Sequence, residues 1–182
     1  MQFEKGAFYH LYNRTNNNEP LFPLAENYFY FLQKFELHLI PHCAVVAYCL
    51  MPTHFHFLIR VKTNDPLLIS KQIAILLRSY TRAINKRFFR HGNLFQQNTK
   101  AKHIDNESYL LTLMNYIHQN PIRARLSRKP VDWEYSSYRD YAGIRNGILT
   151  NKSLMAHYFD SSEKFVRYSE DIVEFVKKEY WV

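Results

Sequence analysis

The sequence is poor in cysteine and lacks long apolar runs, and each scarcity excludes a class of protein. Its two cysteines, Cys43 and Cys49, cannot build a disulfide framework, and on one strand they would lie about 20 Å apart, too far to bond. The longest apolar run, Cys43–Met51, has nine residues, whereas a membrane-spanning helix needs about 20. The first residues show no apolar core of an export signal. We therefore expect a reduced, cytoplasmic protein with no membrane partner.

Acidic residues are scarce in one part of the chain. The 24 Lys and Arg and 16 Asp and Glu give a formal net charge of +8. Residues 60–104 hold ten bases against one acid, and residues 123–129 add four bases, so the remainder is slightly acidic. Clustered bases are typical of proteins that bind a polyanion, because they release counterions when they neutralise phosphates. The alternative is that these bases bind no partner and only keep the protein soluble.

Glycine is also scarce, with four in 182 residues, and no repeat or Gly/Ser linker is present. Hydrophobic residues make up 47% of the chain, which excludes disorder as its main state. The length fits one core. We expect a main domain over residues 1–130, with a helical extension over residues 131–182 packed on it.

The apolar pattern predicts four strands and three helices in the order β-α-β-β-α-β-α. The strands are expected at 8–14, 42–50, 54–62 and 95–104, and the helices at 25–39, about 66–89 and about 106–120. This order is that of the ferredoxin-like split β-α-β fold, an antiparallel four-stranded sheet with helices on one face. The class is therefore α+β. The C-terminal extension is expected to be aromatic and helical, and to end in an amphipathic segment at 161–180.

The second predicted helix has a basic stripe. Its apolar residues share one face and are expected to pack on the sheet. Lys71, Arg78, Arg82 and Lys86 fall almost opposite that face. No acids interleave with these bases, which favours a binding surface over an ordinary solvated face.

Two histidines on the third predicted strand could hold a metal ion. Strand side chains alternate, so His54 and His56 point to one face and Phe55 points to the other. Two imidazoles about 7 Å apart along a strand can converge on one cation. Two ordinary histidines on a half-buried strand are the alternative.

The helix at about 106–120 supplies further candidate groups. Tyr116 and Asn120 are one turn apart and lie on one side, beside the apolar stripe that faces the core. The amide oxygen of Asn120 suits Mg or Mn, and the Tyr116 phenol would lie within reach of a metal-bound group. The alternative for Tyr116 is an aromatic ring that only packs in the core. The alternative for Asn120 is a residue that only ends the helix before Pro121.

The motifs around these residues resemble the single-tyrosine HUH (IS200-like) transposases, and most closely the branch of REP-associated tyrosine transposases. Residues 50–56 read Leu-Met-Pro-Thr-His-Phe-His, and residues 116–124 read Tyr-Ile-His-Gln-Asn-Pro-Ile-Arg-Ala. The opening residues 9–14 and the segment 133–138 are also similar to the family. The likeness covers roughly residues 5–143, and the two motifs in this order are far more specific than either alone.

The resemblance implies a site and a reaction. His54, His56 and Asn120 would be ligands of a divalent metal, Mg or Mn. Tyr116 would be the nucleophile that attacks a backbone phosphate of single-stranded DNA, leaving a 5′-phosphotyrosine and a free 3′-hydroxyl. The DNA is expected to carry hairpin ends, and the enzyme to act as a monomer or homodimer.

The resemblance and the charge pattern together predict a set of bases that hold the DNA backbone. These are Arg14, Arg60, Lys71, Arg78, Arg82, Lys86, Lys100, Lys102, Arg123 and Arg125. Three alternatives stay open. Tyr109, on the same helix side, is the rival nucleophile. A nicking or replication-initiator endonuclease would share the site without rejoining strands. A non-catalytic ferredoxin-like nucleic-acid-binding module would use the histidines only for packing.

Overall fold

The computed structural model describes residues 1–156 and 158–170. Its strands and helices, in chain order, are β1 (Phe8–Arg14), α1 (Ala25–Leu39), β2 (Cys43–Met51), β3 (His54–Val61), α2 (Leu68–Arg87), β4 (Lys100–Ile104), α3 (Glu107–Arg123), α4 (Tyr138–Tyr141) and α5 (Ser162–Glu170). Short 3₁₀ turns lie at Asn16–Asn18, Pro130–Asp132 and Lys152–Met155. Within the described residues, no helix is long and apolar enough to cross a bilayer.

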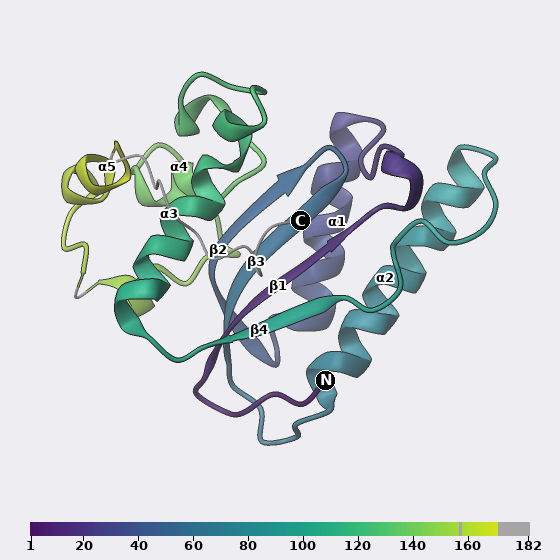
Figure 1. Ribbon diagram of the computed structural model, residues 1–182, viewed down its shortest axis with the longest axis horizontal. Helices are drawn as coiled ribbons and strands as arrows, with labels where there is room; N and C mark the ends of the chain where they lie inside the picture. Colours follow the sequence, from purple (N-terminus) through teal and green to yellow (C-terminus); the bar gives the residue numbers. More distant parts are fainter. Residues whose placement is uncertain (157, 171–182) are drawn as a thin grey trace.

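The four strands form one antiparallel sheet in the order β2-β3-β1-β4 (Figure 1). This confirms the predicted ferredoxin-like arrangement. The prediction was wrong about the start of β4, because Phe95 makes only an isolated bridge to Thr15 and the regular strand begins at Lys100. Asn98 has a φ of 61°, a left-handed conformation that a regular strand cannot contain.

Helices cover both faces of the sheet (Figure 1). The prediction of helices on one face holds for α1 and α2, but α3 packs on the opposite face against β2. Alternation along β3 sends Phe55 and Phe57 to the α1 and α2 face and His56 and Leu58 to the α3 face. Alternation along β2 also supplies both cores, and a β-bulge between Val45 and Ala47 puts the successive residues Val46 and Ala47 on the α3 face.

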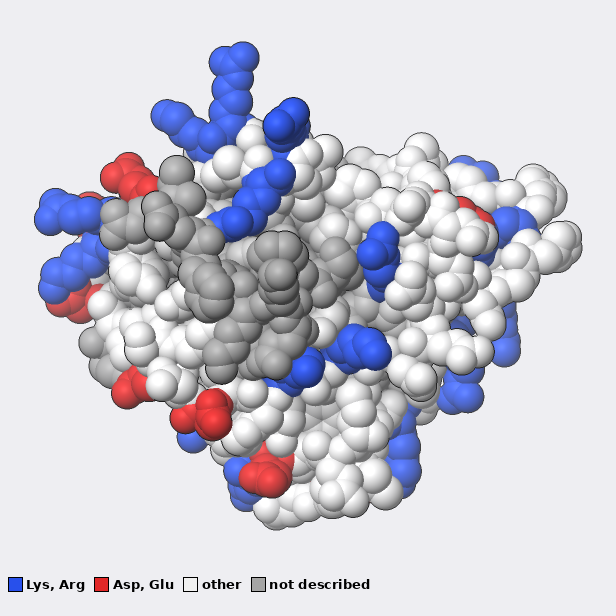
Figure 2. Space-filling model, viewed as in Figure 1, with Lys and Arg blue, Asp and Glu red and all other residues white. Residues whose placement is uncertain are grey.

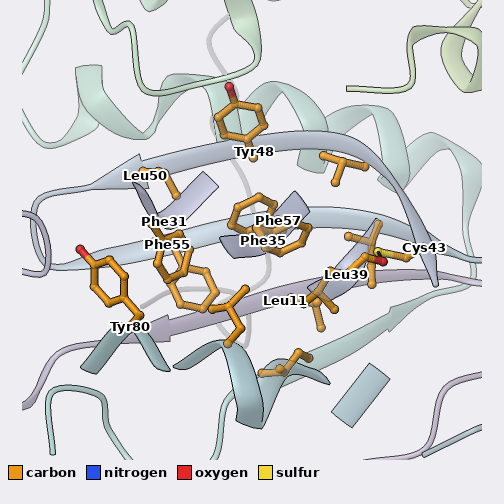
Figure 3. Close-up of a cluster of buried hydrophobic side chains, with 14 of the residues drawn as sticks. Leu11, Phe31, Phe35, Leu39, Cys43, Tyr48, Leu50, Phe55, Phe57 and Tyr80 are labelled. Atoms are coloured by element: carbon orange, nitrogen blue, oxygen red, sulfur yellow. Dashed lines mark hydrogen bonds between the residues drawn. The ribbon is translucent and has the colours of Figure 1, made fainter. Parts of the chain in front are cut away.

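Aromatic side chains hold the core under α1 and α2 together (Figure 3). The ring of Phe57 stacks on that of Phe35, with centroids 3.8 Å apart, and Phe55 packs against Phe31 at 5.2 Å. The Tyr80 hydroxyl donates to the Leu21 carbonyl at 2.8 Å, so its buried polar atom is satisfied. Burial of these rings anchors β3 and thereby fixes which face its histidines occupy.

The C-terminal extension runs along the free edge of β2. The Leu50 amide donates to the Tyr135 carbonyl at 2.9 Å, and the Trp133 indole donates to the Leu50 carbonyl at 3.0 Å. These contacts cover an edge that would otherwise be open to pairing with another chain. The extension is less helical than predicted up to α5, and the predicted amphipathic segment beyond residue 170 lies outside the described residues. The division at residue 130 stays a prediction.

Helix α3 is buried on both sides, since residues 113–120 are all buried. One side packs on β2, and the other meets α4 and α5 through His118 and Phe165. Nε2 of His118 lies 2.7 Å from Oγ of Ser137, a hydroxyl that also accepts the Tyr48 amide at 2.9 Å. Burial lowers the pKa of His118 to about 3, so this imidazole is neutral at physiological pH.

The buried His118 predicts a specific loss of stability in acid. Its pKa is lower in the folded chain than in the unfolded one, so the unfolded chain binds the extra proton and stability falls as pH drops below about 6.5. We expect His118→Gln to reduce that pH dependence by about 1.4 kcal/mol per pH unit between about pH 6 and 4. Urea unfolding at a series of pH values measures it. The exposed His91→Gln is the control, and an unchanged slope in His118→Gln would contradict this role.

Candidate active site

His54 and His56 lie side by side on the face of β3 that meets α3. Their ring centroids are 5.2 Å apart, and the rings are nearly perpendicular. Each uses its Nδ1 in a hydrogen bond, His54 with the Thr53 hydroxyl at 3.1 Å and His56 with Nε2 of His10 at 2.9 Å. Nε2 of His56 is buried and makes no hydrogen bond within the described part of the chain. That nitrogen is the atom a metal ion would use.

Both histidines are neutral at physiological pH. Burial lowers the pKa of His54 to about 4, with the nearby Arg14 acting in the same direction. Burial holds the pKa of His56 well below its usual value, helped by the charges that His10 and His54 would carry. Since a metal ion binds the unprotonated imidazole, these two side chains are held in their ligating form.

Tyr116 lies beside this pair. Its ring centroid is 6.2 Å from that of His56 and meets it edge to face, and 7% of the residue is exposed. The Arg123 guanidinium lies over the Tyr116 ring, 5.3 Å from the centroid. Burial raises the pKa of the Tyr116 phenol, and Arg123 opposes that rise by favouring the phenolate.

The rival Tyr109 is two turns nearer the start of α3, about 10 Å along the helix axis. It is half-buried at the margin of the core on this face. The aromatic neighbour of His56 on α3 is Tyr116. The geometry therefore favours Tyr116 over Tyr109 as the group that works with the histidines.

Asn120 owes its orientation to Pro121. The helix was expected to end or kink at Pro121 but continues to Arg123. Proline has no amide hydrogen, so the Ile117 carbonyl lacks its usual partner four residues on. The Asn120 side-chain amide nitrogen donates to the carbonyls of Tyr116 at 3.1 Å and Ile117 at 3.4 Å. This leaves Oδ1 as the Asn120 amide atom available to a ligand.

These donors fit a divalent cation. An amide oxygen suits Mg or Mn and imidazole nitrogens also ligate Zn, Fe and Ni, so the donor set is compatible with several divalent metals. Residues 1–156 and 158–170 contain no group of three or more His, Cys, Asp and Glu placed to hold a metal, so a site here depends on the amide of Asn120. The buried nitrogen of His56 supplies the structural reason to expect a ligand.

The predicted DNA-binding bases divide between the two faces of the sheet. Strand register places Arg14 opposite His54, Lys100 opposite Tyr12 and Lys102 opposite His10, so these three bases share the histidine face. Figure 2 shows Lys and Arg side chains over β4 and over the loop that follows α3. Arg123, at the end of α3, and Arg125, just after it, are both exposed.

The other predicted bases lie farther away. Arg60 is on the histidine face but at the far end of β3, about 20 Å along the strand from His54. The stripe on α2 (Lys71, Arg78, Arg82 and Lys86) belongs to the helix layer on the opposite face. The sheet therefore separates the α2 stripe from the histidines. Arg78 and Arg82 instead line a groove of about 680 Å³ between α2 and residues 93–99.

Sequence reasoning missed His10 as part of the site. His10 is fully buried, and its Nε2 lies 2.9 Å from Nδ1 of His56. The available signal was alternation along β1, which puts His10 and Tyr12 on one face. The register that brings this face beside His56 is a tertiary property and cannot be read from the pattern of one strand.

Comparison with known proteins agrees with this geometry. Residues 5–120 match the family model described as transposase IS200-like, which is well over half of the chain. The chain belongs to the IS200-like transposase family. The match includes β1, both site histidines and the helix that carries Tyr116 and Asn120.

The chain is similar to two REP-associated tyrosine transposases. A protein of Haemophilus influenzae whose provisional description is REP-associated tyrosine transposase is 28% identical over 102 residues. That match covers 51% of this chain and 57% of the relative's length. A solved REP-associated tyrosine transposase bound to a REP hairpin superposes with a TM-score of 0.66 at 15% identity, covering 83% of this chain and 94% of that one. The second comparison shows that the fold is shared.

The contact between Arg123 and Tyr116 predicts a shift in the pKa of the Tyr116 phenol. Because Arg123 lowers the pKa of Tyr116, we expect Arg123→Gln to raise it. The measurement is an alkaline titration of ¹³Cζ-labelled tyrosine by NMR, with the Tyr116 signal identified by its loss in Tyr116→Phe. The exposed Arg125→Gln serves as control and should leave the pKa unchanged. An unchanged or lowered pKa in Arg123→Gln would contradict the contact.

Proposed function

We propose that this chain is a DNA transposase that cuts and rejoins single-stranded DNA through a 5′-phosphotyrosine at Tyr116. The observation that carries the proposal is the position of Tyr116 beside His56, whose buried Nε2 has no hydrogen bond within the described residues. Membership of the IS200-like family supports the reaction class.

The covalent step follows from the groups at hand. The phenol gives its proton to solvent, and Oη of Tyr116 attacks the phosphorus of a backbone phosphate. The bond from phosphorus to the 3′-oxygen breaks, and the departing 3′-oxygen takes up a proton from solvent to become the free 3′-hydroxyl. A phenol is a weak nucleophile at its ordinary pKa of about 10, so the charge of Arg123 over the ring assists by favouring phenolate. Attack by a second 3′-hydroxyl reverses the step and reseals the strand. The phosphotyrosine conserves the bond energy, so no nucleotide cofactor is required.

His54, His56 and Asn120 would hold the divalent cation, Mg or Mn. Bound there, the ion would supply Lewis-acid polarisation of the scissile phosphate. The chain's own residues prepare this site. Burial keeps the imidazoles neutral, and the backbone carbonyls of Tyr116 and Ile117 fix the Asn120 amide.

The bases on the histidine face would hold the DNA next to the reacting phosphate. Arg14, Lys100, Lys102 and Arg123 lie on the elements that frame the site, and the exposed Arg125 follows α3. The α2 stripe, Arg60 and the groove beside Arg78 and Arg82 would contact DNA farther from the cut. A solved relative is bound to a REP hairpin, which supports hairpin-ended single strands as the substrate.

One chain suffices for this arrangement. Tyr116 contacts His56 of its own chain. Tyr116 lies on α3 and His56 on β3, and α3 packs directly on the sheet that contains β3. We therefore propose that a monomer is competent for cleavage, and that a homodimer, if it forms, is not needed to complete the site.

Substitution of Tyr116 tests the nucleophile. With Mg or Mn and a 3′-labelled hairpin oligonucleotide, the wild type is expected to give a labelled protein band that survives denaturation. Tyr116→Phe should lose it at least about 1,000-fold, because no phenolic oxygen remains to attack. The matched control Tyr109→Phe should retain it. An adduct that survives in Tyr116→Phe would refute the assignment, and no adduct with wild type over a broad substrate panel would support the binding-module alternative.

The polarity of the link and the rejoining step need their own readouts. A 5′-labelled oligonucleotide should release a shorter labelled strand with a free 3′-hydroxyl and leave the protein unlabelled. With the 3′-labelled oligonucleotide, adding an acceptor strand that has a 3′-hydroxyl should then transfer the labelled fragment from the protein to that strand and give a longer labelled product. Cleavage without joining would indicate a nicking or replication-initiator endonuclease instead of a transposase.

The division of bases between the two faces predicts different salt dependence. For a short single strand that spans only the site, Lys100→Gln with Lys102→Gln should weaken binding and reduce the slope of log K against log salt by about 0.7 per charge removed. Lys71→Gln with Lys86→Gln removes the same charge on the other face and should leave the slope nearly unchanged. Fluorescence anisotropy at several salt concentrations measures both. Equal slopes for the two double variants would contradict the proposed DNA path.

A further inference from the structure

We propose that His10 is a positioning residue that sets the tautomer and ring orientation of His56, so that Nε2 of His56 presents its lone pair to the metal site. The inference deepens the proposed function and rests on it. His10 itself stays outside the ligand set.

The two imidazoles are held together in the sheet interior. Nε2 of His10 lies 2.9 Å from Nδ1 of His56, and both residues are completely buried. Their rings are nearly parallel, with 16° between the planes and 5.1 Å between centroids. His10 pairs with Leu58 across β1 and β3, while His56 pairs with Tyr12, so the two histidines are diagonal neighbours on one face.

One hydrogen between the two nitrogens decides the state of the site. A neutral imidazole carries a single N–H, and the other nitrogen holds a lone pair. If Nδ1 of His56 donates to His10, Nε2 of His56 has the lone pair that a cation needs. If His10 donates instead, the His56 proton must sit on Nε2 and blocks the ligand position.

A metal site requires the first arrangement. Nε2 of His56 makes no hydrogen bond within the described residues, so in that tautomer its lone pair is open to a cation. A lone pair in the same place is satisfied as soon as a cation binds. Metal-ligating histidines generally donate their second nitrogen to a neighbouring acceptor, which fixes the ring. In this chain the acceptor is Nε2 of another histidine on the adjacent strand.

Packing is the competing explanation, since the His10 ring also lies 4.8 Å from that of Tyr12. Two substitutions separate the roles. His10→Phe keeps an aromatic ring and removes the acceptor, whereas His10→Gln removes the ring and keeps an acceptor at a similar distance from the backbone. A packing role predicts that Phe is tolerated better than Gln, and a positioning role predicts the reverse.

The first test measures Mn²⁺ binding to the full chain without DNA. Electron paramagnetic resonance reports the concentration of free Mn²⁺ during the titration. We expect His10→Phe to weaken binding by about 10- to 100-fold and His10→Gln to stay within about threefold of wild type. The exposed His103→Phe, on neighbouring β4, is the control and should bind as wild type does. Equal affinity in wild type and His10→Phe would overturn the proposal.

The second test reads the tautomer directly in the wild type. Two-dimensional ¹⁵N NMR of the metal-free chain should show His56 with its proton on Nδ1 and none on Nε2. The opposite tautomer would overturn the role of His10 even if the variants fail to fold. Absence of Mn²⁺ binding in the wild type, with the expected tautomer present, would instead refute the metal site of the proposed function.

Discussion

The burial of Phe55 and Phe57 is the constraint on which the site depends. Phe57 stacks on Phe35 and Phe55 packs on Phe31, so β3 cannot rotate or shift by one residue without exposing two aromatic rings. Burying such a ring is worth roughly 1.5–3 kcal/mol, and a one-residue shift would reverse every side chain on the strand. The aromatic core on one face thus holds His54 and His56 on the other.

A second layer completes the site from the opposite direction. Helix α3 lies between the sheet and α4 and α5, and this double burial fixes the rotation of the helix about its axis. That rotation brings Tyr116 to the ring of His56 and leaves Arg123 over the phenol. The C-terminal extension contributes to the site by packing against this helix. A buried hydrogen bond between His118 of α3 and Ser137 of the extension joins the two.

Local periodicity was enough to predict the bounds of β1 and α1 and the shared face of the two site histidines. It could not predict features set by tertiary contact. The left-handed Asn98 delays β4, and α3 packs on the face opposite α1 and α2, which separates the basic stripe of α2 from the histidines. His10 was missed because strand register is decided by the whole sheet. The catalytic and ligand roles of the site residues stay predictions.

The central claim is that Tyr116 carries the DNA during the reaction. The most direct measurement is mass spectrometry of the covalent adduct after protease and nuclease digestion, which locates the modified residue. The account predicts a nucleotide linked through its 5′-phosphate to Tyr116 in a reaction that requires a divalent metal. The same modification on Tyr109, or a link through a 3′-phosphate, would contradict it.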